Sequence, residues 1–98
     1  MATKVQQRNA AILRAAVEEA QETGLNSLTR DAVATRANVA QGTVNNAYGT
    51  IADLRAAVLE HAVTHEVLPL IAQGLAAGSP IAKNAPESLK TRALASLA

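Results

Sequence analysis

Apolar side chains in this 98-residue chain recur at three- and four-residue intervals, and no segment alternates apolar and polar residues as a half-buried strand does. In residues 4–23 this spacing places one apolar stripe along a helix, formed by Val5, Ile12, Leu13, Ala16, Val17 and Ala20. Gly24 follows directly, and glycine is the residue that most often ends a helix. The spacing therefore predicts an all-α fold.

Two short helices are predicted next. The polar residues 26–29 offer N-cap side chains for a helix from about Arg30 to Ala37. Asn38 tolerates the left-handed backbone region and is expected to form a turn. A second short helix is expected from about Ala40 to Ala47.

A longer fourth helix is expected from about Ala52. Pro69 should kink or restart it, because proline cannot donate to the preceding turn. Gly78-Ser79-Pro80 is typical of a turn, and Pro86 is expected to open a final short helix through about Leu97.

The fourth helix carries apolar residues on two opposed sides. One side has Leu54, Val58, His61, His65 and Leu68, and the other has Leu59, Val63, Val67 and Leu70. Such a helix needs two surfaces to pack against, and the short C-terminal helix offers few apolar groups. We therefore predict dimerisation through Leu59, Val63, Val67 and Leu70, with residues 1–50 as a separate domain and residues 51–98 as a helical dimerisation segment.

Composition argues against several other classes of protein. The chain has no cysteine, so it forms neither a disulfide framework nor a Cys-based zinc site. Its start is polar, and no apolar run reaches membrane-spanning length, so a cytoplasmic protein is expected. His61 and His65 lie four residues apart, but the sequence shows no further metal ligand near them. With no catalytic motif either, we expect no enzyme activity, no metal and no cofactor.

The window from Arg30 to Ala47 has the steric pattern of a helix-turn-helix. Ala34 is small where two steeply crossing helices approach most closely, Asn38 occupies the turn, and Val39 is an apolar anchor just after it. The outward positions of the second helix are then small or polar: Gln41, Gly42, Thr43, Asn45 and Asn46.

Together with Ile12-Leu13-Arg14-Ala15-Ala16, Gly24-Leu25, Thr29, Val33-Ala34, residues 39–44 and Asp53-Leu54, this window resembles the tetracycline-repressor (TetR) type of bacterial regulators. The resemblance covers about residues 8–60. It implies a helix-turn-helix three-helix domain followed by a long fourth helix and short C-terminal helices. It also implies a homodimeric regulator, usually a repressor, whose second short helix enters the major groove.

The chain departs from the family pattern at several positions. The family's turn glycine, its serine cap on the recognition helix and its lysine before the fourth helix are here Asn38, Ala40 and Ile51. Its late aromatic residues, which often contact phosphate, are here Asn45 and Ala47. Fewer than 40 residues follow Glu60, so no small-molecule inducer is expected, and the size is similar to that of small plasmid and phage repressors.

Asn, Gln and Thr side chains can pair with base edges in the major groove. The predicted base-reading residues are Gln41, Thr43, Asn45 and Asn46, and Gly42 is predicted to allow close approach to DNA. The predicted backbone contacts are Lys4, Arg8, Thr29, Arg30, Tyr48 and Thr50, with a role for Tyr48 in covering the core left open. Residues 1–50 are therefore predicted to be a helix-turn-helix DNA-binding domain. The expected partners are an inverted repeat of double-stranded DNA and a second copy of the chain.

One alternative stays open. A net charge of only +1 and the missing aromatic clamp also fit a small helical protein-interaction module that does not read DNA.

Overall fold

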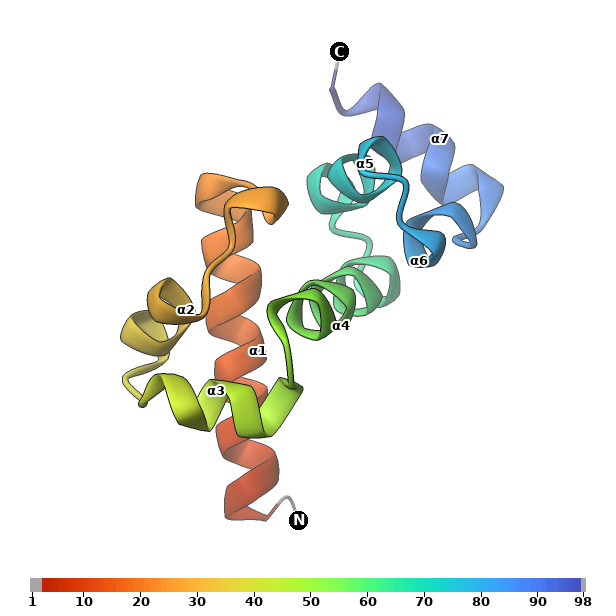
Figure 1. Cartoon of the computed structure of the whole chain (residues 1–98). Helices are drawn as coiled ribbons and strands as arrows, with labels where there is room; N and C mark the ends of the chain where they lie inside the picture. The colour runs from red at the N-terminus through yellow and green to blue at the C-terminus, as the bar shows by residue number, and fades with distance from the viewer. Residues whose placement is uncertain (1–2, 98) are drawn as a thin grey trace.

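The computed structural model describes residues 3–97, and this part of the chain is helical without any strand, as the sequence predicts (Figure 1). The elements in chain order are α1 (Lys4–Thr23), the 3₁₀ turn η1 (Leu25–Ser27), α2 (Arg30–Ala37), α3 (Gln41–Tyr48), α4 (Ile51–Thr64), α5 (Leu68–Ala76), α6 (Pro80–Lys83) and α7 (Glu87–Ala95). Residues 1 and 2 of the predicted segment 1–50, and residue 98 of the predicted segment 51–98, lie outside the described residues.

Threonine caps begin three of these helices. The side-chain oxygens of Thr3, Thr29 and Thr50 each accept a hydrogen bond from a backbone N–H of the first turn that follows. At Thr50 the cap is reciprocal, because the side chain of Asp53 accepts from the Thr50 backbone N–H at 3.0 Å. These caps fix where α1, α2 and α4 start, and hence how the helix-turn-helix is held at its two ends.

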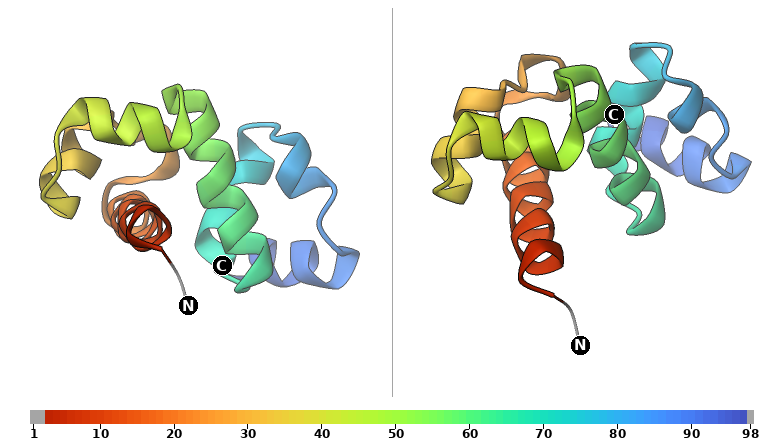
Figure 2. Two further views of the ribbon diagram at one scale, coloured as in Figure 1. Left: turned by 90° about the horizontal axis from the view of Figure 1, so that it is seen from below. Right: turned by 60° about the horizontal axis from the view of Figure 1, so that its bottom comes forward.

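The helices form two groups that share one core. α1 runs through the first group, with α2 beside it and α3 lying across it, and α4 then leads to α5, α6 and α7 (Figures 1 and 2). The largest fully buried side chains come from both groups: Ile12, Leu28, Val33, Val44, Leu54, Val58, Leu70 and Ile71. Residues 1–50 and 51–98 both contribute to this buried core, which therefore spans the predicted boundary. Their division into two domains stays a prediction about function.

The fourth helix is shorter than the helix over residues 54–70 that the apolar spacing predicts. α4 ends at Thr64, and Glu66 has a left-handed backbone with φ 55°. Pro69 lies in the first turn of α5, where its missing N–H is not needed, so the prediction that it restarts the helix is confirmed. Residues on either side of this break do not share a helical face, which removes the basis for grouping 54–70 as one helix.

The predicted dimer residues need a correction for the same reason. α5 folds back onto α4, so Leu59 is 3% exposed and Leu70 is fully buried within the single chain. Close packing of α5 depends on Gly74, where an added Cβ would come within 2.7 Å of Leu59. Leu59 and Leu70 thus have no side-chain surface left for a partner, whereas Val63 and Val67 stay half-buried.

The C-terminal helices also differ from expectation in detail. Pro86 is the N-cap of α7 rather than its first residue, and α7 ends at Ala95. The short helix α6 was not predicted. It follows the turn at Gly78, whose positive φ of 78° only glycine adopts without strain.

Candidate nucleic-acid interface

The turn between α2 and α3 has the geometry that the sequence predicts. Asn38 is left-handed, with φ 58° and ψ 48°, and the Val39 N–H donates to the Ala34 carbonyl at 2.9 Å. Ala34 is 3% exposed at the helix crossing, and Val33 and Val44 are buried beneath it. This hydrogen bond and the small side chain at the crossing together set the angle of a helix-turn-helix.

One side of α3 presents small and polar residues to solvent. Gln41, Gly42, Asn45 and Asn46 are exposed and Thr43 is half-buried, while Val44 is buried on the opposite side. The predicted outward placement is confirmed for Gln41, Gly42, Asn45 and Asn46, whereas Thr43 is only partly exposed. Because the outward side chains carry amide and hydroxyl groups, α3 can donate to and accept from base edges.

Two of these amides are held by α2. Asp31 Oδ1 accepts from Gln41 Nε2 at 3.0 Å, and Arg30 Nη1 donates to Asn45 Oδ1 at 3.0 Å. Arg30 and Asp31 are the first two residues of α2, so its N-terminus is tied to successive turns of α3. These tertiary contacts were not predicted, since helical spacing within α3 says nothing of what lies beside it.

Gly42 has open space where a side chain would be. A Cβ placed there would have no heavy atom within 4 Å. Nothing in the fold therefore requires glycine at this position, and its backbone conformation is ordinary. If this position requires glycine, the requirement comes from a binding partner and not from the fold.

The residues predicted to contact the DNA backbone differ in exposure and in hydrogen bonding. Lys4 and Arg8 are exposed on the first turns of α1, which extend past α3 (Figure 1). Thr29 and Thr50 use a lone pair for capping, so each hydroxyl proton is left to donate elsewhere. Arg30 uses one N–H for Asn45 and keeps further donors on its guanidinium.

Tyr48 is turned inward. Its hydroxyl donates to the Asn9 carbonyl of α1 at 2.8 Å, and burial raises the pKa of this phenol. Tyr48 thus joins the end of α3 to α1 and helps to cover the core, the alternative that the sequence left open. Because its proton is used in this way, we do not propose a phosphate contact for Tyr48.

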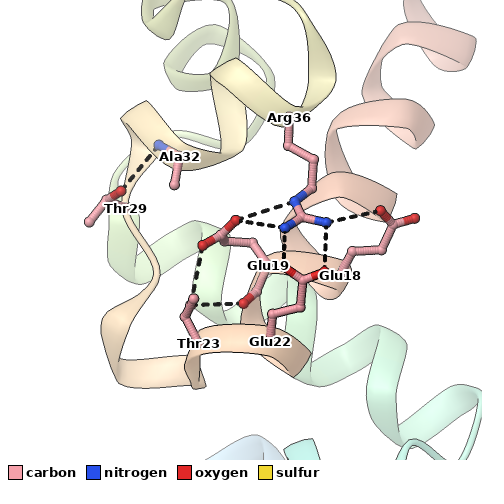
Figure 3. Close-up of polar contacts among 7 residues, drawn as sticks. All are labelled: Glu18, Glu19, Glu22, Thr23, Thr29, Ala32 and Arg36. Atoms are coloured by element: carbon pink, nitrogen blue, oxygen red, sulfur yellow. Dashed lines mark hydrogen bonds and ion pairs between the residues drawn. The ribbon is translucent and has the colours of Figure 1, made fainter.

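Arg36 is held on α1 by three acidic side chains (Figure 3). Its guanidinium lies 3.4 Å from the carboxylate of Glu18 and 3.1 Å from that of Glu19. It also forms a close hydrogen-bonded ion pair with Glu22. Hydrogen bonding to Arg36 and its positive charge lower the pKa of Glu22, and the bond to Glu22 raises the pKa of Arg36. The cluster fastens the C-terminal end of α2 to α1.

This cluster also separates charge within the first 50 residues. Three of the four acids there lie in the second half of α1, which extends away from α3 in Figure 1. Without the Arg36 cluster, four basic side chains remain against Asp31 alone: Lys4, Arg8, Arg14 and Arg30. The part of the first group outside this cluster is consequently more basic than the chain's total charge indicates.

His61 and His65 stack at the end of α4, with ring centroids 4.2 Å apart. Burial and the neighbouring His65 lower the pKa of His61. In the described residues no group of three or more potential metal ligands comes together. Nor does any described helix have the length and apolar character needed to cross a membrane.

The steeply crossed α2 and α3, with a polar outward face on α3, define a helix-turn-helix DNA-binding protein. Residues 12–58 match the family model of bacterial regulatory proteins of the tetR family, a segment that runs from α1 into α4 and covers just under half of the chain. This segment is accordingly a helix-turn-helix domain of the TetR type, which supports a DNA-binding transcriptional regulator. Comparisons with curated proteins and with solved structures gave no match.

Proposed function

We propose that this regulator is a homodimeric repressor, acting in the cytoplasm, that binds a short inverted-repeat operator. The observation that carries the proposal is the exposed row of Gln41, Gly42, Asn45 and Asn46 on α3, with no apolar side chain among them. A face of this chemistry suits base edges, which offer hydrogen-bond donors and acceptors, better than it suits a protein surface.

Base reading is assigned to Gln41, Thr43, Asn45 and Asn46, with Gly42 letting the backbone of α3 approach the groove. Phosphates are assigned to Lys4, Arg8, Thr29, Arg30 and Thr50. These five residues lie at the starts of α1, α2 and α4, and side chains or N–H groups at helix starts suit anions.

Selection of bound sequences from random duplexes tests this function directly. The expected result is one enriched motif with two symmetry-related halves about 34 Å apart, or a small multiple of that spacing. If no sequence is enriched, the chain does not read DNA, and a helical protein-interaction module becomes the better account.

Replacing Gln41 or Asn45 by Ala should weaken binding to the selected site by about 1–3 kcal/mol, because each amide pairs with a base edge. Affinity for random duplex should change little. Fluorescence anisotropy on both duplexes measures the two effects, with exposed Gln21 on α1 replaced by Ala as the matched control. Equal losses on both duplexes would show that these amides do not read sequence.

Neutralising Lys4 or Arg8, each to Gln, should weaken binding to every duplex and lower the salt dependence. The expected change is about one unit of log–log slope for each phosphate that a subunit no longer neutralises, because fewer counterions are then released on binding. Titrations between low and moderate salt give the slope. Lys83, on α6 in the other helix group, is the control cation, and an unchanged slope in the Lys4 and Arg8 variants would place the grip elsewhere.

Dimerisation is proposed through the C-terminal half, through apolar side chains that the single chain leaves wholly or partly exposed there. Leu94 is 55% exposed and Leu97 is 65% exposed, and Val63 and Val67 are half-buried. A second subunit would bury this surface and double the number of DNA contacts, which a weakly basic single domain needs for specific affinity.

Light scattering of the free protein should give a mass near twice 10.1 kDa. A Leu94→Glu variant should lower that mass, since a charge would be placed in the interface. The control is Val5→Glu, because Val5 is exposed to nearly the same extent, 54%, but lies on α1. A monomer that still protects both halves of the selected site would contradict the dimer.

A further inference from the structure

The orientation of the Gln41 side-chain amide is fixed by the chemistry of its partner. A carboxylate only accepts hydrogen bonds, so the amide must turn its NH₂ toward Asp31 Oδ1, 3.0 Å from Gln41 Nε2. The reversed amide would set an oxygen against a carboxylate, which repels it. Gln41 Oε1 is thereby left as the atom without a partner on α2.

The Asn45 amide is fixed in the opposite sense. A guanidinium only donates, so the oxygen Oδ1 faces Arg30 Nη1 at 3.0 Å, and Nδ2 is directed away from it. Gln41 and Asn45 lie four residues apart and hence on the same side of α3. One exposed face therefore offers an oriented acceptor and, one turn later, an oriented donor.

We propose that Asp31 and Arg30 are positioning residues that decide which bases α3 reads. This inference rests on the proposed DNA-binding function and names its specificity. The only hydrogen-bond donors in the major groove are adenine N6 and cytosine N4, so Gln41 Oε1 selects adenine or cytosine. Asn45 Nδ2 selects a base with an acceptor there: guanine N7 or O6, adenine N7, or thymine O4.

The physical reason for such a device is that a free amide has no fixed polarity. Its two ends have nearly the same shape, and a half-turn exchanges donor for acceptor. An unpartnered Gln41 would thus accept from one base or donate to another with little discrimination. Both hydrogen bonds here have one charged partner, which makes them stronger than bonds between neutral groups.

The main test is Asp31→Asn, which keeps the size of the side chain but can face either end of the Gln41 amide. At the base pair that Gln41→Ala identifies, the wild-type protein should prefer one orientation of the pair, with adenine or cytosine on the strand that Gln41 faces, about tenfold over the reversed pair. The variant should lose most of this preference while its discrimination at other positions is kept. Glu60→Gln removes the same charge from exposed α4 and should keep the preference, which separates orientation from general electrostatics.

A base analogue isolates the amino group itself. If adenine is selected, purine in its place lacks N6, and if cytosine is selected, 2-pyrimidinone lacks N4. Either change should weaken wild-type binding about tenfold and Asp31→Asn binding much less. For the Arg30–Asn45 pair, Arg30→Met should relax the base preference at the position that Asn45→Ala identifies. Because this variant also loses a cation, the quantity compared is the ratio of its affinities for the selected and the random duplex.

A measurement without DNA checks the hydrogen bond in the free protein. The Gln41 side-chain NH₂ resonances should shift in Asp31→Asn and stay in place in Glu60→Gln. If a site is selected and Gln41 reads it, but Asp31→Asn keeps the base preference or removal of the amino group leaves wild-type binding unchanged, the orientation model is overturned while the DNA-binding function stands. If no site is selected, the proposed function itself has failed.

Discussion

Replacing Leu70 by Ala is expected to lower the free energy of unfolding by about 2–5 kcal/mol, the range for removing a fully buried leucine side chain. Leu70 on α5 is 0% exposed and belongs to the core cluster that also contains Ile12 of α1. Because small domains are marginally stable, a loss of this size is a large share of the total. Urea unfolding followed by circular dichroism gives the value.

The same experiment tests whether both helix groups unfold together. Tyr48 is the only aromatic residue in the chain and lies in the first group, so its fluorescence reports on α1–α3 alone. With one shared core, the fluorescence and circular dichroism midpoints of Leu70→Ala should shift equally. Val5→Ala, at a 54% exposed site on α1, should change stability by less than about 0.5 kcal/mol. An unshifted tyrosine midpoint in Leu70→Ala would mean that the C-terminal group unfolds independently.

Replacing Gly42 by Ala is expected to weaken DNA binding about 5- to 150-fold without harming the fold. The added Cβ meets nothing within 4 Å in the free protein, and alanine is the better helix former, so stability should stay the same or rise by up to about 1 kcal/mol. The weaker binding to DNA arises because a methyl group would enter a closely packed surface, which costs about 1–3 kcal/mol. Anisotropy titrations and thermal unfolding measure the two effects.

Gly74 provides the matched control, since it is also a glycine inside a helix. There an added Cβ would lie 2.7 Å from Leu59 and 3.0 Å from Ala82, so Gly74→Ala should destabilise the fold instead. The two substitutions are chemically the same and should have opposite effects on stability. If Gly42→Ala binds the selected site as tightly as the wild type, Gly42 is a tolerated helix residue and not a point of close approach.

The local elements could be predicted from the sequence because short-range interactions decide them. Thr29 caps α2, Asn38 takes the left-handed turn, and Ala40 starts α3 without a side-chain cap, all as residue type indicates. The outward face of α3 follows in the same way, since Val44 has to be buried and helical geometry then places Gly42 and Asn46 on the opposite side.

The fourth helix shows where local reasoning fails. Apolar spacing across Leu54–Leu70 fits one long helix, and periodicity alone does not show that the chain turns at Glu66. Once it turns, α5 covers Leu59, and residues that a single helix would expose to a partner become internal. The surface proposed for dimerisation therefore lies at Leu94 and Leu97, together with the half-buried Val63 and Val67.

Amino-acid sequence alone determined that the chain is all-helical, where its first four helices begin and which way α3 faces, because caps, turn residues and apolar spacing act within a few residues. Only the tertiary structure decided the partners of Arg36, Gln41 and Asn45, which come from residues 10 to 18 positions away. It also decided which leucines are internal. Contacts of this kind depend on how whole helices pack, and no local pattern records the packing.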